Sequence, residues 1–367
     1  MKVERETAGF ALPFTAGVLL AAYYGLYSIH TFSPAGALLI LCIIALLHPS
    51  RRSLPPYIIR IIIGTAALSA GITCGFTSLH ISAGATGSQP GFIAEGFGAR
   101  MQEAIDRIPF KDIRCNAVAK ALLTGERCDI PKDIAAAFRD SGGAHILALS
   151  GLHLGIIYSI ITHSLSIFSN HRRLWIPRSV IVISSCGFYT LATGAGPSIV
   201  RAFLFICLNE TGRLCHRHRS TGQLLFSALI LQLTYAPLSV LSAGFQLSYA
   251  AMAGIAFILP RLQSLWPGNI YDDRPFTRFI RKIWNACAMS ISCQITTAPL
   301  AYIYFRTFPQ YFLLTNLIAL PLTGIIIPAI LISLILCVLG IDIPFITALT
   351  ESLISALITA LETIAGM

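Results

Sequence analysis

The sequence predicts an all-α, polytopic integral membrane protein with about eleven spans. Of the 367 residues, 55% are hydrophobic and only 11% are charged, whereas about a quarter of the residues in a typical soluble domain are charged. Several apolar runs reach the ~20 residues that a helix needs to cross a bilayer. The charged start MKVERE leads into an apolar run without an A-x-A cleavage site, so we expect a retained span rather than a signal peptide. Together these observations exclude the soluble fold classes.

Each expected span is an apolar run bounded by charged or turn-forming residues. In chain order the runs are residues 10–27, 34–47, 61–79, 144–168, 176–195, 197–208, 224–240, 244–259, 284–304, 311–339 and 344–364. The second run is short enough to be a re-entrant segment instead. We therefore expect an N-terminal three-span segment (1–81), a small helical extracytoplasmic region (82–143) and a C-terminal transmembrane domain (144–367).

The positive charges predict the orientation. If the N-terminus is cytoplasmic and the spans alternate, the cytoplasmic segments and their edges hold sixteen Lys and Arg residues, and the short outer loops hold only Arg306. Lys and Arg collect on the cytoplasmic side of membrane proteins. This predicts a multi-pass protein with a cytoplasmic N-terminus, and it explains most of the net charge of +10 without nucleic-acid binding. No Lys or Arg follows Arg306, so the last two spans are not oriented by this rule.

The outer region 82–143 has helical patterning of its own. Apolar residues recur at helical spacing opposite charged ones, which is typical of a helix in the membrane interface; they are Phe97, Met101, Ile105 and Ile108. A second helix is expected over 113–124 with Gly125 as its C-cap, and a third begins near Asp129 and Pro131. Cys115 and Cys128 flank the second helix, and an oxidising periplasm would allow a disulfide between them.

The stretch 141–155, SGGAHILALSGLHLG, carries polar side chains into the fourth expected span. Polar groups at membrane depth are costly and mark functional sites by default. Ser141, His145, Ser150 and His153 could form a polar stripe along a hydrated pore, or each could be bonded to nearby backbone. On one continuous helix His145 and His153 would lie roughly 80° apart, and Ser150 would neighbour His153.

Other polar residues lie inside or beside later spans. Arg201 sits in a short apolar run, where it could face a pore mouth and contact phosphate or snorkel to the interface. Gln246 and Ser248 lie just inside the run that begins at residue 244. Asn316 precedes Pro321, so 311–320 is read either as a half-helix lining a cavity or as part of a proline-kinked span.

Small residues suggest turns and close helix packing. Gly142 and Gly143 would permit the turn into the membrane, because glycine tolerates a positive φ. Gly151 and Gly155 form a small-xxx-small pair that lets two membrane helices approach closely. Gly196 and Pro197 precede Arg201 and could act as a hinge.

The basic segment 260–283 contains aromatic residues among five positive charges. Such a loop could bind single-stranded nucleic acid, although membrane orientation alone also explains its charge. No lysine follows a glycine anywhere in the chain, so no Walker A motif is present. We expect no metal site, no cofactor and no catalytic activity.

Five motifs together resemble the ComEC competence proteins. They are LLTGER (122–127), FRDSGGAHILALSGLHLG (138–155), GPSIVRA (196–202), GFQLSYAAMAGI (244–255) and TTAPLAYIYFRTFPQYFLLTNLIALPL (296–322), in the order of that family. The resemblance implies an inner-membrane channel that passes single-stranded DNA into the cytoplasm during natural transformation. It also implies a periplasmic DNA-binding competence protein, a cytoplasmic helicase-like ATPase and a separate nuclease as partners, besides DNA and the bilayer.

The chain departs from the family pattern in two places. The interval 82–143 leaves no room for an OB-fold domain, and no HxHxDH signature of a metallo-β-lactamase-like domain occurs. We therefore expect the channel module alone. Three alternatives stay open: an intramembrane hydrolase using Ser141 or Ser150 with a histidine, a small-solute transporter, and an inactive scaffold. The expected inverted repeats of a transporter are not visible.

Overall fold

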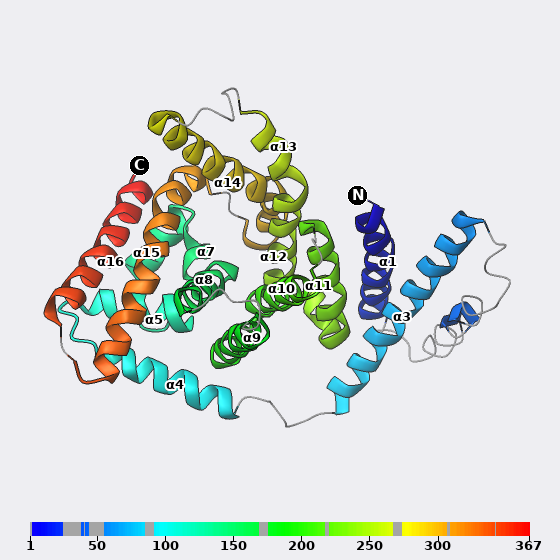
Figure 1. The fold of residues 1–367 in the computed structure, drawn as a ribbon, viewed down its shortest axis with the longest axis horizontal. Helices are drawn as coiled ribbons and strands as arrows, with labels where there is room; N and C mark the ends of the chain where they lie inside the picture. Colours follow the sequence, from blue (N-terminus) through cyan, green and yellow to red (C-terminus); the bar gives the residue numbers. More distant parts are fainter. Residues whose placement is uncertain are drawn as a thin grey trace. The chain divides into compact units, whose positions relative to one another are not determined.

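The computed structural model describes residues 2–24, 38–39, 41–43, 55–84, 92–168, 175–216, 220–266, 274–306, 309–341 and 343–367. Throughout these residues the regular secondary structure is helical (Figure 1), which confirms the all-α prediction. The chain forms two compact units, Met1–Gln89 with Thr211–Tyr249 and Pro90–Glu210 with Ala250–Met367. Most of the predicted run 34–47 lies outside the described residues.

Unit 1 is built on a tight helix pair. It contains α1 (Lys2–Tyr24), α3 (Pro56–Gly84), α11 (Thr221–Tyr235) and the 3₁₀ helix η4 (Pro237–Leu241). A Cβ atom added to Gly71 of α3 would lie 2.0 Å from the carbonyl oxygen of Phe14 of α1, and one on Gly17 would lie 2.1 Å from that of Leu68. The two backbones thus touch where small residues allow it, as is common between membrane helices.

Unit 2 holds most of the motif-bearing helices. They are α4 (Phe92–Asp106), α5 (Ile113–Thr124), α6 (Lys132–Asp140), α7 (Ala144–Leu147), α8 (Gly151–Phe168), α9 (Trp175–Ala192), α13 (Leu259–Ser264), α14 (Pro275–Phe305), α15 (Phe312–Val338) and α16 (Pro344–Ala365), with the π-helical turn η5 (Gly254–Ile258). Two helices run from one unit into the other, α10 (Pro197–Leu214) and α12 (Ala243–Ala253).

The main core of unit 2 joins the expected outer region to the last two expected spans. Leu122 of α5 and Phe138 of α6 are fully buried against Ile327 of α15 and Leu357 of α16. Antiparallel α15 and α16 lie side by side beside α5 (Figure 1). The helices of 82–143 therefore pack against α15 and α16 as part of unit 2. The three-part division of the chain stays a prediction.

The predicted outer helices form, and α5 has the expected C-cap at Gly125. The expected cap at Asp129 is not found, because α6 begins at Lys132 with Pro131 in the N-cap position and no side-chain cap. Asp112 caps α5 by accepting a hydrogen bond from the Arg114 N–H at 2.9 Å, and Gly125 ends the helix with φ of 79°, which glycine adopts without strain. Along α4 the predicted apolar face is turned inward, with Ile105 completely buried. Phe97 packs edge-on against Phe188 of α9, with 4.4 Å between the ring centroids.

Six described helices are long and apolar enough to cross a membrane: Glu4–Tyr23, Tyr57–Gly75, Ala243–Ser264, Pro275–Phe305, Phe312–Val338 and Pro344–Ala365. The helices α8, α9 and α10 have 18 residues each but are not among these six. The six candidate spans confirm a helical membrane bundle, and the number of about eleven spans stays a prediction.

Three expected helices differ from those observed. The run 144–168 is not one helix, since α7 ends at Leu147 and α8 begins at Gly151. The half-helix over 311–320 is wrong: α15 continues through Pro321 and Pro328, which agrees with the alternative of one span containing both prolines. The run 224–240 ends as an α-helix at Tyr235, because Pro237 follows and starts η4.

Candidate functional site

The break between α7 and α8 is the local feature on which the candidate site depends. Ala148 leaves the helix in an extended conformation, with φ of −76° and ψ of 127°. Ser150 then caps α8: its Oγ accepts from the Leu152 N–H at 3.2 Å. In return, His153 Nδ1 accepts from the Ser150 N–H at 3.3 Å. This is a reciprocal capping box in which histidine takes the place of the usual Glu or Gln.

The capping box corrects the expected geometry of the polar stripe. Ser150 and His153 are neighbours, with 3.2 Å between Ser150 Oγ and His153 Nδ1, but as a helix cap rather than as two positions on one helix face. The predicted angle of roughly 80° between His145 and His153 is wrong, because the two residues belong to different helices.

The LLTGER segment (122–127) packs against this break. A Cβ atom on Gly125 would lie 2.5 Å from Leu149 Cδ1, so Leu149 packs directly on the glycine that ends α5. The Tyr189 hydroxyl of α9 donates to the Leu123 carbonyl at 2.7 Å. The end of α5 is therefore held between α9 and the α7–α8 break.

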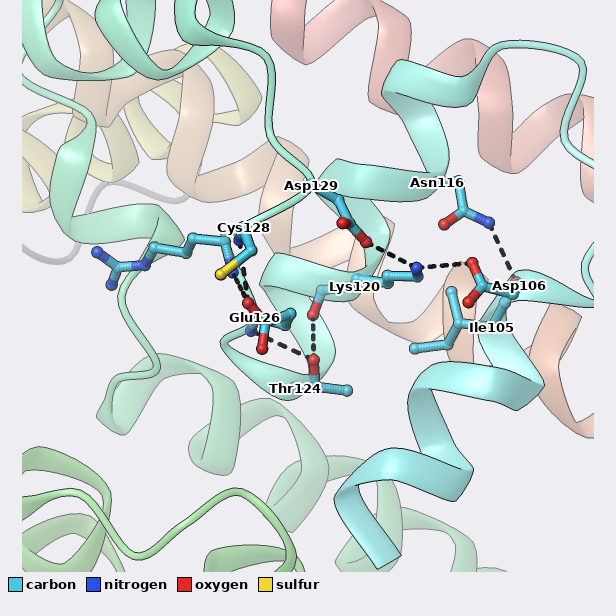
Figure 2. A network of polar contacts seen from close by, with 9 residues as sticks. Ile105, Asp106, Asn116, Lys120, Thr124, Glu126, Cys128 and Asp129 are labelled. Atoms are coloured by element: carbon cyan, nitrogen blue, oxygen red, sulfur yellow. Dashed lines mark hydrogen bonds and ion pairs between the residues drawn. The ribbon is translucent and has the colours of Figure 1, made fainter. Parts of the chain in front are cut away.

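Polar contacts hold the C-terminal half of α5 and the turn after it to their neighbours. Figure 2 shows Lys120 Nζ between Asp106 Oδ1 at 2.7 Å and Asp129 Oδ2 at 2.8 Å. These hydrogen bonds raise the pKa of Lys120. Glu126 Oε1 accepts from the Cys128 N–H at 3.0 Å, and its bonds with Cys128 lower the pKa of the Glu126 carboxyl. These contacts have a structural role, because they join α4, α5 and the turn before α6.

The turn into α7 relies on Gly142. Its φ is +85°, and a Cβ atom there would lie 2.8 Å from Pro309 Cβ, so only glycine fits. Ser141 is fully buried; its Oγ donates to the Phe138 carbonyl at 3.3 Å, and its carbonyl accepts from Thr315 Oγ1 at 2.6 Å. These two hydrogen bonds hold Ser141 in the turn. Gly143 packs against α15 and α16.

Four polar residues from four helices of unit 2 surround the break: His145 of α7, His153 of α8, Arg201 of α10 and Asn316 of α15. His145 is exposed and its Nδ1 lies 3.1 Å from the Gly142 carbonyl. Asn316 lies beside the His145 side chain. A Cβ atom on Gly151 would lie 3.4 Å from Arg201 Nη2, so this guanidinium lies against the first residue of α8.

Two buried polar atoms of this cluster have no hydrogen-bond partner among the described residues. They are Nε2 of His153, whose side chain is 1% exposed, and Oδ1 of Asn316. Because His153 Nδ1 accepts a backbone N–H, its proton resides on Nε2, which is therefore an unmatched donor. Leaving such a group unpaired costs about 1–3 kcal/mol. A buried unmatched donor and acceptor beside a cation are what a polar ligand or water would satisfy.

The remaining predicted residues fall elsewhere. Gln246 and Ser248 belong to unit 1, and Gln246 Nε2 donates to the Val240 carbonyl at 2.9 Å. Gly151 does meet α10, at Ala202, but Gly155 has nothing near its Cβ position, so only half of the predicted packing pair is in contact. Pro197 is the first residue of α10 and follows Gly196, the position that suits proline best.

The disulfide between Cys115 and Cys128 is not formed; both thiols are free. Cys115 is buried near the start of α5 with Sγ 3.4 Å from Ser355 Oγ. Cys128 is exposed beyond the far end of this helix, which puts more than two helical turns between them.

Glu210 was not among the residues predicted from the sequence. This carboxylate is fully buried in α10 and accepts from the Tyr158 hydroxyl at 2.8 Å and from Ser179 Oγ at 2.7 Å. The signal was present, since Glu210 is the only acid in α10 and intramembrane acids are functional candidates. It lies nine residues from Arg201, or roughly 14 Å along the helix and half a turn away, so the two are separate features.

Among the described residues, the serine–histidine pair of the site lacks the third group of a catalytic triad. Ser150 and His153 are within reach of each other, but neither a carboxylate nor another acceptor orients His153 Nε2 within the described part of the chain, as a catalytic triad would require. Nor do the described residues contain a group of three or more His, Cys, Asp or Glu side chains suited to a metal.

Comparison with known proteins gives consistent results. The model of the family "Competence protein" matches residues 122–367. ComE operon protein 3 of Bacillus subtilis (strain 168) is 27% identical over 215 residues, which cover 58% of this chain and 24% of that protein. The uncharacterized protein YcaI of Escherichia coli (strain K12) is 27% identical over 232 residues, which cover 61% of this chain and 30% of that protein. The chain thus spans less than a third of the length of either relative, and no solved structure matches it significantly. Because the family match extends over more than half of its residues, the chain belongs to the competence protein family.

Proposed function

We propose that this protein is a membrane channel that passes single-stranded DNA into the cytoplasm during natural transformation. The observation that carries the proposal is the cluster around the α7–α8 break. There the unmatched Nε2 donor of His153 lies in unit 2 with Arg201, whose guanidinium borders the start of α8. A phosphodiester supplies the oxygen acceptors and the negative charge that such groups favour.

The arrangement suits transient contact rather than tight binding. Arg201 is 7% exposed and His153 1% exposed, so each would meet a phosphate inside the bundle and not at its surface. A channel needs contacts that are favourable enough to admit the ion and weak enough to release it. In the proposal, neutral His153 donates one hydrogen bond while Arg201 supplies the charge, and each phosphate is handed on as the strand moves.

The proposal places the protein in the inner membrane with a cytoplasmic N-terminus. A periplasmic DNA-binding protein would deliver the strand, a cytoplasmic ATPase would pull it, and a separate nuclease would degrade its complement. These assignments come from the family resemblance, and the charge pattern of the sequence supports the orientation.

The capping role of His153 permits a matched pair of variants. Gln and Glu are both standard residues at this third helical position of a capping box, so His153→Gln and His153→Glu should both preserve the start of α8. They differ by one negative charge at the proposed phosphate contact. We expect His153→Glu to lower cytoplasmic arrival of radiolabelled DNA at least tenfold relative to His153→Gln, at equal protein level in the membrane. Equal uptake by the two variants would exclude a polyanion path at His153.

Arg201 provides the second test, with Arg213 of the same helix as its control. Arg201→Gln should abolish DNA uptake, whereas Arg213→Gln removes the same charge from the last turn of α10 and should leave uptake near that of the unmodified protein. Normal transformation by the Arg201→Gln variant would refute the assignment of this residue to the path.

One contact favours a second candidate, an intramembrane serine hydrolase: the distance of 3.2 Å between Ser150 Oγ and His153 Nδ1. Ser150→Asn discriminates between the two functions, because asparagine is as good an N-cap as serine but is no nucleophile. The channel predicts unchanged DNA uptake and no labelling of Ser150 by a fluorophosphonate. A hydrolase predicts labelling of the unmodified protein and loss of activity in the variant.

A further inference from the structure

The beginning of α14 carries a basic and aromatic face that the proposed DNA path does not use. The helix has 31 residues, which makes it ~46 Å long, whereas a bilayer core of ~30 Å takes about 20 residues. About ten residues must therefore extend beyond the hydrocarbon. The cations Arg278, Arg281 and Lys282 lie within the first turns, while 283–305 contains no charged residue, so the extension is at the start of the helix.

The charge of this end is positive and accessible. Arg274, Arg278 and Lys282 are exposed. Over residues 260–284 the sequence has five Lys and Arg residues against Asp272 and Asp273. The N-terminal end of a helix adds a partial positive charge of its own. An anionic surface is the electrostatic complement of this end.

Apolar rings lie among these cations. Phe276 is 72% exposed and Phe279 is 61% exposed, which would be costly in water. Trp266, two residues beyond α13, and Trp284 of α14 have ring centroids 5.9 Å apart, and α13 and α14 lie side by side (Figure 1). Neither indole Nε1 meets an acceptor among the described residues, although both are shielded from water. Rings of this kind, with one polar atom, collect at the membrane–water interface.

We infer that this face binds anionic phospholipids, with the headgroup phosphates on Arg274, Arg278 and Lys282 and the rings of Phe276 and Phe279 among the upper acyl carbons. Basic clusters directly beside a membrane span attract anionic headgroups, and aromatic side chains insert about 5–10 Å into the interface. Single-stranded nucleic acid fits the face less well, because its stacking rings would have to stay in water. The inference rests on insertion of α14 in a membrane and not on the passage of DNA.

Tryptophan fluorescence provides a direct test, since two of the three tryptophans of the chain belong to this face. The full chain carrying Trp175→Phe is reconstituted into vesicles of equal phosphatidylglycerol and phosphatidylcholine content, in which only one of the two lipids is brominated. We expect brominated phosphatidylglycerol to quench Trp266 and Trp284 at least about twofold more efficiently than brominated phosphatidylcholine, because of local enrichment.

A charge-neutral variant and a matched control complete the test. The triple change Arg274→Gln, Arg278→Gln and Lys282→Gln should bring the quenching ratio to one. The control, Arg100→Gln, Lys111→Gln and Lys132→Gln, removes three exposed charges from the region 92–143 and should leave the ratio unchanged. Equal quenching by both lipids in the parent protein, or an unchanged ratio in the first triple variant, would overturn the inference. So would an oligonucleotide that displaces the anionic lipid at this face, which would mark it as a nucleic-acid surface. Circular dichroism and the elution profile of each variant verify folding.

Discussion

Replacing Gly125 by alanine should destabilise the protein for two separable reasons. The φ of 79° costs an L-residue about 1–2 kcal/mol. The new Cβ would also lie 2.5 Å from Leu149 Cδ1, and such overpacking costs about 1–3 kcal/mol. The expected loss in the free energy of unfolding is therefore about 2–5 kcal/mol.

A double-mutant cycle with Leu149→Ala separates the two terms. Without the leucine side chain the steric term disappears, so Gly125→Ala should cost only the conformational ~1–2 kcal/mol, and the coupling energy should be about 1–3 kcal/mol. Unfolding is followed by circular dichroism during denaturation of the purified protein in detergent micelles. If Gly125→Ala costs the same with and without Leu149, the end of α5 does not support the α7–α8 break.

A second glycine supplies a control, because alanine there should have the opposite effect on stability. Gly155 lies within α8 and has no atom within 4 Å of its Cβ position. Alanine there should stabilise the helix by about 0.5–1 kcal/mol, in the same assay. Destabilisation by Gly155→Ala would mean that another helix approaches this position, as the sequence pattern had suggested.

Two further predictions concern buried groups and thiols. Glu210→Gln should lower the free energy of unfolding by about 1 kcal/mol, since glutamine still offers one acceptor oxygen. Glu210→Leu should lower it by about 2–3 kcal/mol more, because the hydroxyls of Tyr158 and Ser179 both lose their acceptor. Equal values for the two variants in a denaturation series would mean that these hydrogen bonds contribute little. Maleimide should label Cys128 in the native protein and Cys115 only after denaturation, with no effect of reductant. Hydrogen bonding to Glu126 raises the pKa of the Cys128 thiol, so Glu126→Gln should accelerate labelling at neutral pH, and an unchanged rate would contradict this cause.

Local turn chemistry was the part of the fold that the sequence predicted best. The α5 helix and its Gly125 cap, the turn at Gly142 and the apolar face of α4 all follow from residue preferences within a few positions. The α7–α8 break was missed because apolar residues continue through it, although Ser150 followed three residues later by a polar side chain is a recognisable cap. The prolines of α15 led to the opposite error, a predicted helix end where the helix continues. α15 runs through Pro321 and Pro328, since neighbouring groups in a bundle can compensate for lost helical hydrogen bonds.

The candidate site was predictable as a set of residues but not as a geometry. His145, His153, Arg201 and Asn316 each stand out as polar within apolar runs, yet only the fold shows that four helices of unit 2 bring them to one break. No local pattern indicates that α5 and α6 pack against α16, because these partners lie more than 200 residues apart in sequence. Glu210 was overlooked for a different reason, since it lay beyond the end assigned to its span.

The core shared by α5, α6, α15 and α16 has a consequence for biosynthesis. At a ribosomal speed of about 5–20 residues per second, the last two helices emerge roughly 10–40 s after α7 has been made. Throughout that interval Leu122 and Phe138 lack the side chains that bury them in the finished protein. The nascent chain therefore passes through an open state, in which the insertion machinery or a chaperone would shelter these helices until translation ends.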